Sequence, residues 1–401
     1  MLKVLLYILF ASLTVINADT KMGNCHNCII DERLPNIIDK DLTLVASKIY
    51  GIDKKVLVTN GATLTIEPGT TLAGCSLFSV LVISRNSRII ARGTKQRPIT
   101  FTSQIDLLGF SSQKGVGEWG GVVIAGNAYT HYNNNKYEAD ESVSFGSSNH
   151  DHDEESSGVL EYVAIKHTGY EVKKDKELNG LSLAGVGKGT QIKNIAIIGG
   201  QDDGIEIWGG SVNIDGLFIY NAMDDSVDVD LGYRGEIKNV LVIQEKVASH
   251  NNHDSSVMEI GNDEKMHTPD EKSVTLPYIK NLTGYVKGGG IYNKYDAGFI
   301  LQNVQLLSDK RKDNEMVFFR GKNSYKTGEK YLYDDVCLYN EFKGKNIADY
   351  LSQENSKGIK QNYTPYKYFT LNNKGLGNGN FKVLQNCAGV NKNTIWTAGI
   401  K

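Results

Sequence analysis

The amino-acid sequence predicts an all-β protein wound into a right-handed parallel β-helix (a solenoid). Three segments with the same order of aliphatic and polar residues begin at Ile192, Ile214 and Ile237, which lie 22 and 23 residues apart. Between them, residues 205–207 and 227–229 each place two aliphatic residues around one acidic residue. Successive side chains of a strand point to opposite faces, so the aliphatic residues of each segment share one face. Repeats of this length, with glycine and asparagine between the strands, are typical of a β-helix.

Residues 1–18 have the features of a signal peptide. A positively charged start precedes an apolar stretch over residues 4–16, and Ala18 ends a cleavage site with small residues. The apolar stretch is too short to span a bilayer. Cys25 follows it too late for a lipoprotein signal. We therefore expect a mature chain that begins at Asp19, carries no lipid, and is secreted or located in the periplasm or cell envelope.

Composition and charge argue against nucleic acid and anionic membranes as partners. The chain carries 44 Lys and Arg against 46 Asp and Glu, a formal net charge of −2. This near balance provides no basic surface for nucleic acid or for an anionic membrane. After the signal peptide, no stretch is apolar enough to cross a bilayer. The 42 glycines in 401 residues fit a chain with many turns.

The five cysteines predict disulfides, because an exported chain meets an oxidising environment. The preferred pair is Cys337 with Cys387, which would tie down the C-terminal segment. Cys25 and Cys28 form a CxxC motif, but no second CxxC completes a zinc site. The expected alternatives for this motif are a bridge within the pair or a bridge from one of them to Cys75.

Residues 19–54 are expected to form an N-terminal capping segment, and residues 55–307 the β-helix. The first coils alternate aliphatic and polar residues over residues 56–72, with a corner at Pro68-Gly69. Further strands are expected at residues 80–83, 88–91, 99–101, 119–125, 160–165, 257–260, 279–282 and 301–304.

Two insertions interrupt the coils. Residues 129–157 are polar and rich in Asn and His, so they are expected to form a long surface loop. The second insertion covers residues 246–273. Beyond Ser308 the repeats give way to charged and Tyr-rich sequence. Because the open end of a β-helix pairs with other chains unless it is covered, residues 308–401 are expected to form a C-terminal cap, with a small carbohydrate-binding module as the alternative.

Seven strings of residues occur in a fixed order along the coils: GATLTIEPGTTL, RIIARGTKQRPITFTS, GEWGGVVIAGNA, SGVLEYVAIKHTG, LNGLSLAGVGKGTQIKN, DDGIEIWGG and DDSVDVDLGYRG. Together they resemble a family of exported bacterial parallel β-helix proteins with a pectate-lyase-like fold, many of them lipoproteins. The resemblance covers residues 55–265. It implies the β-helix fold and an envelope or extracellular location, and no particular activity. The chain departs from many members because it lacks the lipidated cysteine.

Acidic residues recur from coil to coil and are expected to stack as an acidic ladder. The members are Asp202, Asp203, Glu206, Asp224, Asp225, Asp228, Asp230 and Glu259. Adjacent coils lie about 4.8 Å apart, so these carboxylates repel unless protons, basic side chains or cations neutralise them. Calcium suits such a site because it takes six to eight oxygen ligands. The predicted calcium ligands are Asp203, Asp225, Asp228 and Glu259, and no other cofactor is expected. Alternatively, Asp202 and Asp224 are turn residues bonded to local backbone, and the other acidic residues are solvated.

A catalytic role is the other interpretation of the ladder. Residues 201–203 and 223–225 resemble the Asn-Thr-Asp and Asp-Asp motifs of polygalacturonase-type β-helix hydrolases, and His253 loosely resembles their Gly-His-Gly. The resemblance implies that Asp203, Asp224 and Asp225 are the acid and base of an inverting hydrolase. The chain lacks the Gly-His-Gly and the Arg-Ile-Lys that follow in that family.

Three residues are candidates for ligand binding. Trp208 is expected on the outward side of its strand, beside Asp230, where it could stack on a sugar ring. Arg234 would clamp a substrate carboxylate or act as a counter-charge to the ladder. His253 lies in the second insertion, beside the expected groove. The run His150-Asp-His152 is expected to be a solvated loop, with a divalent metal site as its alternative.

The sequence thus predicts a secreted or envelope-associated β-helix protein. We expect it to bind a glycan or another surface component without catalysis, with the assistance of calcium. The alternative is a polysaccharide hydrolase or lyase that uses Asp203, Asp224 and Asp225.

Overall fold

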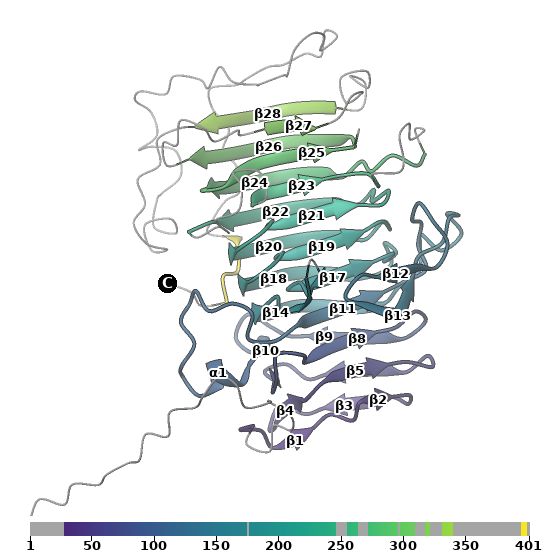
Figure 1. Ribbon diagram of the computed structural model, residues 1–401, viewed down its shortest axis with the longest axis vertical. Coiled ribbons are helices and arrows are strands. Elements are labelled where there is room, and N and C mark those ends of the chain that lie inside the picture. The colour runs from purple at the N-terminus through teal and green to yellow at the C-terminus, as the bar shows by residue number, and fades with distance from the viewer. Residues whose placement is uncertain are drawn as a thin grey trace, which may run out of the picture.

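The chain forms successive coils, and the strands of these coils stack into two long parallel sheets (Figure 1). The computed structural model describes residues 28–174, 176–245, 255–263, 272–295, 297–308, 317–320, 331–339 and 394–398. For residues 308, 317–320 and 331–339 it describes the backbone alone. The expected signal peptide, Cys25, His253 and Cys387 lie outside the described residues.

The larger sheet has fourteen strands. They are β1 (Glu32–Arg33), β3 (Leu42–Leu44), β4 (Ile49–Ile52), β6 (Thr63–Ile66), β7 (Thr71–Gly74), β9 (Arg88–Arg92), β10 (Ile99–Ser103), β14 (Gly158–Thr168), β18 (Gln191–Gly200), β20 (Asn213–Ala222), β22 (Glu236–Ile243), β24 (Tyr278–Val286), β26 (Phe299–Ser308) and β28 (Tyr331–Tyr339).

The second sheet has ten strands. They are β2 (Ile37–Ile38), β5 (Lys55–Val58), β8 (Val80–Ile83), β11 (Gly121–Ala125), β17 (Leu181–Ala184), β19 (Ile205–Trp208), β21 (Val227–Asp230), β23 (Ser256–Ile260), β25 (Gly289–Lys294) and β27 (Val317–Arg320). Two antiparallel hairpins, β12 (Asn135–Tyr137) with β13 (Asp140–Phe145) and β15 (Glu171–Lys173) with β16 (Lys176–Glu177), and one short helix, α1 (Gln104–Leu107), complete the described elements.

The expected all-β parallel β-helix is confirmed, and its core follows the predicted register. Ile195 pairs with Leu217, which pairs with Val240 on the next coil. Ile205 pairs with Val227 on the other sheet. All five side chains are fully buried, because the aliphatic residues of both sheets face the interior of the coils.

The coils extend beyond the expected limits of residues 55 and 307. Strands β1 to β4 already pair within the two sheets, so the segment expected as an N-terminal cap contributes to the first coils. At the other end, β27 and β28 add backbone pairs to β25 and β26.

Residues 129–157 do not form only a loop, which corrects the expectation for this insertion. They contain the hairpin β12–β13, whose residues Tyr137 and Phe145 are buried. Both aromatic side chains pack on Trp208 of strand β19, with ring centroids 5.2 and 6.1 Å from its ring. The hairpin is antiparallel and lies on the coils instead of continuing them, so its strands lack the period of the repeats.

A disulfide joins Cys28 to Cys75, 47 residues along the chain. The expected alternative of a bridge from the CxxC motif to Cys75 is therefore confirmed. The predicted partner of Cys337 is Cys387, which lies outside the described residues. No helix in the described part of the chain is long and apolar enough to cross a membrane.

From β14 onward, each coil replaces two short strands of the larger sheet with one long strand. Strand β14 pairs with β9 through its first half and with β10 through its second half. The long strands bend where one residue takes a positive φ, as at Asn281 (φ 54°). Asn281 Nδ2 donates to Asn239 Oδ1 (3.0 Å), and Asn303 Nδ2 donates to Asn281 Oδ1 (2.8 Å). Asparagine suits this bend because it tolerates a left-handed backbone and bonds the next coil.

Replacing Asn281 with Ala should destabilise the protein by about 2–3 kcal/mol, since Ala strains at positive φ and the two side-chain hydrogen bonds are lost. Asn281→Gly is the matched control, because glycine adopts this backbone freely and loses the hydrogen bonds alone. Urea unfolding measures both variants. An equal loss of unfolding free energy in the Ala and Gly variants would show that the positive φ at this position adds no strain for Ala.

Candidate functional site: an acidic groove on the second sheet

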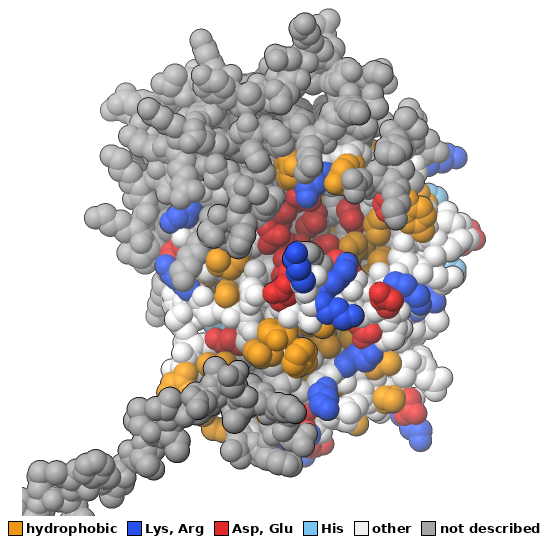
Figure 2. Space-filling view, in the orientation of Figure 1, with side chains coloured by type: hydrophobic (Ala, Val, Ile, Leu, Met, Phe, Trp, Pro, Cys, Tyr) orange, Lys and Arg blue, Asp and Glu red, His pale blue; other side chains and the backbone are white. Residues whose placement is uncertain are grey.

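The carboxylates of the acidic ladder lie on the outer face of the second sheet. Within β19 and β21, the aliphatic residues face the core, so the residues between them face outward. Glu206 pairs in register with Asp228, and Asp228 pairs with Glu259 on the next coil. The predicted stacking of these three acidic residues is therefore confirmed. In Figure 2, acidic side chains gather near the centre of this face.

The aspartates that precede β19 and β21 connect neighbouring coils. Asp203 Oδ1 accepts a hydrogen bond from the backbone N–H of Asp225 (2.9 Å). Asp225 Oδ1 accepts one from the backbone N–H of Ser256. These bonds hold both carboxylates at the edge of the groove. These bonds join successive coils at Asp203 and Asp225, and so they differ from the local turn role expected as an alternative for Asp202 and Asp224.

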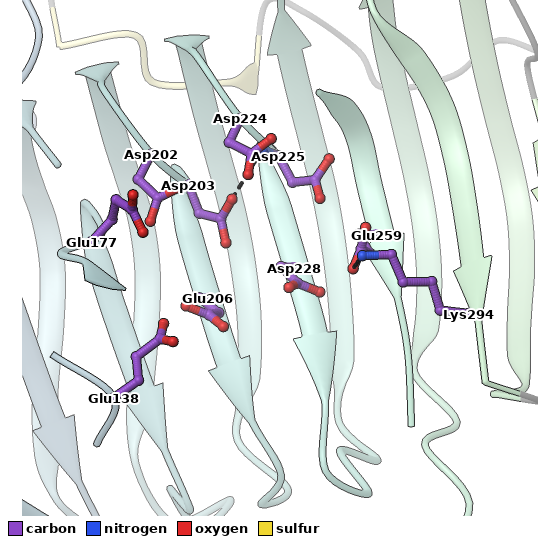
Figure 3. A pocket seen from close by; sticks show the side chains of 10 residues that line it. All are labelled: Glu138, Glu177, Asp202, Asp203, Glu206, Asp224, Asp225, Asp228, Glu259 and Lys294. Atoms are coloured by element: carbon purple, nitrogen blue, oxygen red, sulfur yellow. Dashed lines mark hydrogen bonds and ion pairs between the residues drawn. The ribbon is translucent and has the colours of Figure 1, made fainter. Parts of the chain in front are cut away.

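These residues line a cavity of about 240 Å³, which we call the acidic groove (Figure 3). Its lining consists of nine carboxylates and one ammonium group: Glu138, Glu177, Asp202, Asp203, Glu206, Asp224, Asp225, Asp228, Glu259 and Lys294. Glu138 lies between β12 and β13, Glu177 ends β16, and Lys294 ends β25. These three residues could not be recognised as part of the site from the sequence, because none belongs to the repeated acidic positions.

Burial and mutual repulsion raise the pKa values of the groove carboxyls. For Asp203 and Asp225, loss of hydration is the largest cause, and neighbouring carboxylates raise the pKa further. The same two causes raise the pKa of Glu206 and of Asp228. Asn179 Nδ2 donates to Glu206 Oε2 at 2.5 Å, while Asp228 Oδ1 is buried and accepts no hydrogen bond from the described residues. The groove therefore favours a state in which positive charge or protons offset its carboxylates.

Lys294 is the one basic residue among the described residues that line the groove. Its ammonium group forms an ion pair with Glu259 and lies 5.1 Å from the ring centroid of Tyr292. Burial is the largest single effect and lowers the pKa of Lys294, but the neighbouring carboxylates, Glu259 first, together outweigh it and raise the pKa overall. Lys294 therefore stays protonated at neutral pH.

Three sets of carboxylates bring oxygen atoms within 4.8 Å of one another. The first triad is Asp202, Asp203 and Asp224, the second is Asp203, Glu206 and Asp228, and the third is Asp225, Asp228 and Glu259. The four predicted calcium ligands are all members, and so are Asp203, Asp224 and Asp225 of the catalytic alternative. Close oxygen donors of this kind suit a hard cation such as calcium.

Two of the three predicted ligand-binding residues lie away from the open groove. Trp208 pairs in register with Asp230, as expected, but hairpin β12–β13 covers its ring and leaves it 7% exposed. Arg234 is exposed and absent from the groove lining, and its Nη1 lies 3.5 Å from the Val274 carbonyl oxygen. His253 lies outside the described residues.

The histidine-rich loop forms its own contacts. His150 Nδ1 lies 2.7 Å from Asp153 Oδ2, and the His150 ring stacks on Tyr129 at 4.2 Å. Asp153 also accepts a hydrogen bond from the backbone N–H of Tyr129 (2.8 Å). His152 lies 3.7 Å from Glu155. These contacts give the loop a structural role.

Comparison with known proteins agrees with the fold. The chain matches the family described as a pectate-lyase like beta helix domain over residues 36–384. No curated protein and no solved structure matches the chain. The match covers most of the chain and includes every residue that lines the acidic groove. The chain therefore belongs to the pectate-lyase-like β-helix family.

Proposed function

We propose that the acidic groove binds divalent cations, calcium in particular, and uses them to hold a glycan or another oxygen-rich surface component without catalysis. The overlapping carboxylate triads carry this proposal. Three carboxylates supply part of the coordination shell of calcium, which takes six to eight oxygens. The remaining positions are then open to water or to hydroxyl and carboxylate groups of a ligand.

The arrangement of charges favours binding over catalysis. Oxygen atoms from three carboxylates lie within 4.8 Å of one another in each triad, so one cation can contact all three. Protonated Lys294 is not a base, so a lyase reaction in this groove would depend on one of its carboxylates.

One observation favours polysaccharide hydrolysis as the second candidate. The raised pKa of Asp203 and Asp225 would let one of them hold a proton near neutral pH, as a general acid requires. In this candidate, Asp224 would be the base. The lining of the groove gives no further support to this assignment.

A glycan-binding experiment tests the proposal. We expect the protein to be retained by a panel of immobilised acidic and neutral glycans in millimolar calcium, and released by EDTA. Asp228→Asn should weaken retention at least tenfold, because Asp228 belongs to two triads. Asp151→Asn is the matched control, since Asp151 is exposed in the histidine-rich loop.

Two results would contradict the proposal. Retention that EDTA does not change would remove the role of calcium. Release of shortened or unsaturated sugars by the purified protein, abolished in Asp225→Asn, would show that the groove is catalytic.

A further inference from the structure

We propose that Lys294 acts as a built-in counter-cation at the third triad, so that divalent cations occupy only the first and second triads, which share Asp203. This inference rests on the proposed function, because it assigns the cations of the groove to particular carboxylates. The two ends of the groove would then differ: exchangeable cations would bind at the end near Glu138 and Glu177, and the ammonium group of Lys294 would occupy the opposite end.

The position of Lys294 matches the third triad. The carboxylates that act on its ammonium group are Glu259, Asp228 and Asp225, which are the three members of that triad. Figure 3 shows the ammonium group beside Glu259, at the end of the groove away from Glu138 and Glu177. The side chain is 24% exposed, so much of its charge is withdrawn from water.

A divalent cation at the third triad would have to displace this ammonium group. Both are cations and both need Glu259, so they compete for the same oxygen atoms. The ammonium group is tethered to strand β25, so it returns to Glu259 without having to be captured from solution. Competition of this kind weakens the binding of a freely diffusing cation at the third triad relative to the other two.

The first and second triads are arranged to share a ligand. Asp203 contributes to both, and a carboxylate can bridge two cations through its two oxygens. Asp228 provides an independent indication of a missing partner, because its buried Oδ1 lines the groove and accepts no hydrogen bond from the described residues. An unsatisfied buried oxygen is costly, and a cation at the second triad would satisfy it.

Counting bound calcium in Lys294→Met tests the inference. Methionine keeps most of the length of lysine and removes its charge. After equilibrium dialysis against calcium and metal analysis of the full chain, we expect Lys294→Met to bind one more cation per chain than the wild type. Lys294→Arg, which retains the positive charge, should bind the wild-type number.

A second variant keeps the test decisive if Lys294→Met does not fold. Glu259→Gln removes one carboxylate from the third triad and none from the others. We expect it to bind the wild-type number of cations, because no divalent cation occupies that triad. Loss of one cation in Glu259→Gln would overturn the inference.

The two levels of proposal fail in different ways. Folded Lys294→Met with the wild-type number of cations would overturn the assignment of Lys294 and leave calcium binding intact. A wild-type protein that binds no calcium in the same dialysis would overturn the proposed function itself.

Discussion

Calcium should raise the melting temperature of the protein by several degrees at neutral pH. A ligand that binds only the folded state, present at 100 times its dissociation constant, adds about 2.7 kcal/mol to the free energy of unfolding. The expected gain has a specific source here, because calcium also relieves the repulsion among buried carboxylates such as Asp203, Asp225 and Asp228. Scanning calorimetry in calcium and in EDTA measures the shift.

The shift should depend on pH with a defined sign. The groove carboxyls have folded pKa values above their unfolded values, so the folded state binds protons more tightly. Without calcium, this contribution to stability is present below about pH 4 and is lost as pH rises through the raised folded values. We therefore expect calcium to stabilise the protein weakly at about pH 5, where the groove carboxyls hold protons, and strongly at about pH 8, where they are ionised.

Asp228→Asn supplies the matched comparison. It should reduce the calcium shift and should leave the calcium-free protein at least as stable as the wild type near neutral pH, because one repelling charge is gone. Asp151→Asn should change neither quantity, since Asp151 is exposed and outside the groove. A calcium shift of equal size in Asp228→Asn, or a shift that grows as pH falls, would contradict the cation site.

Val227→Asp should be the most damaging single change. Val227 is fully buried and pairs in register with Ile205 of the neighbouring coil. Its replacement forfeits about 1.5–3 kcal/mol of apolar burial and adds several kcal/mol for a buried carboxyl without a partner. The sum, at least about 5 kcal/mol, is comparable with the whole stability of many proteins.

Far-UV circular dichroism and urea unfolding measure this effect. We expect Val227→Asp to lose β structure or to unfold at much lower urea concentration than the wild type. Gln191→Asp is the control, because Gln191 is an exposed residue of the larger sheet. Equal stability of the two variants would mean that the interior of the coils does not require apolar side chains.

The fold and the stacking of the acidic ladder could be predicted from local sequence. Alternation along a strand determines which side chains face outward, and a constant repeat length determines which of them stack. Those two rules place Ile195, Leu217 and Val240 in the core, and they place Glu206 beside Asp228. Both rules act over one coil, so they can be recognised in a linear sequence.

Only the tertiary structure decided which other residues lie around the acidic ladder. Glu138 and Glu177 reach the groove from two inserted hairpins, and Lys294 reaches it after an insertion that breaks the constant spacing. The hairpin β12–β13 also covers Trp208, which its outward position had suggested was open to a ligand. An insertion has no repeat to fix where it packs, so its position depends on contacts between residues far apart in the chain. The same contacts bury the carboxylates, and burial is what turns a row of acidic residues into a candidate cation site.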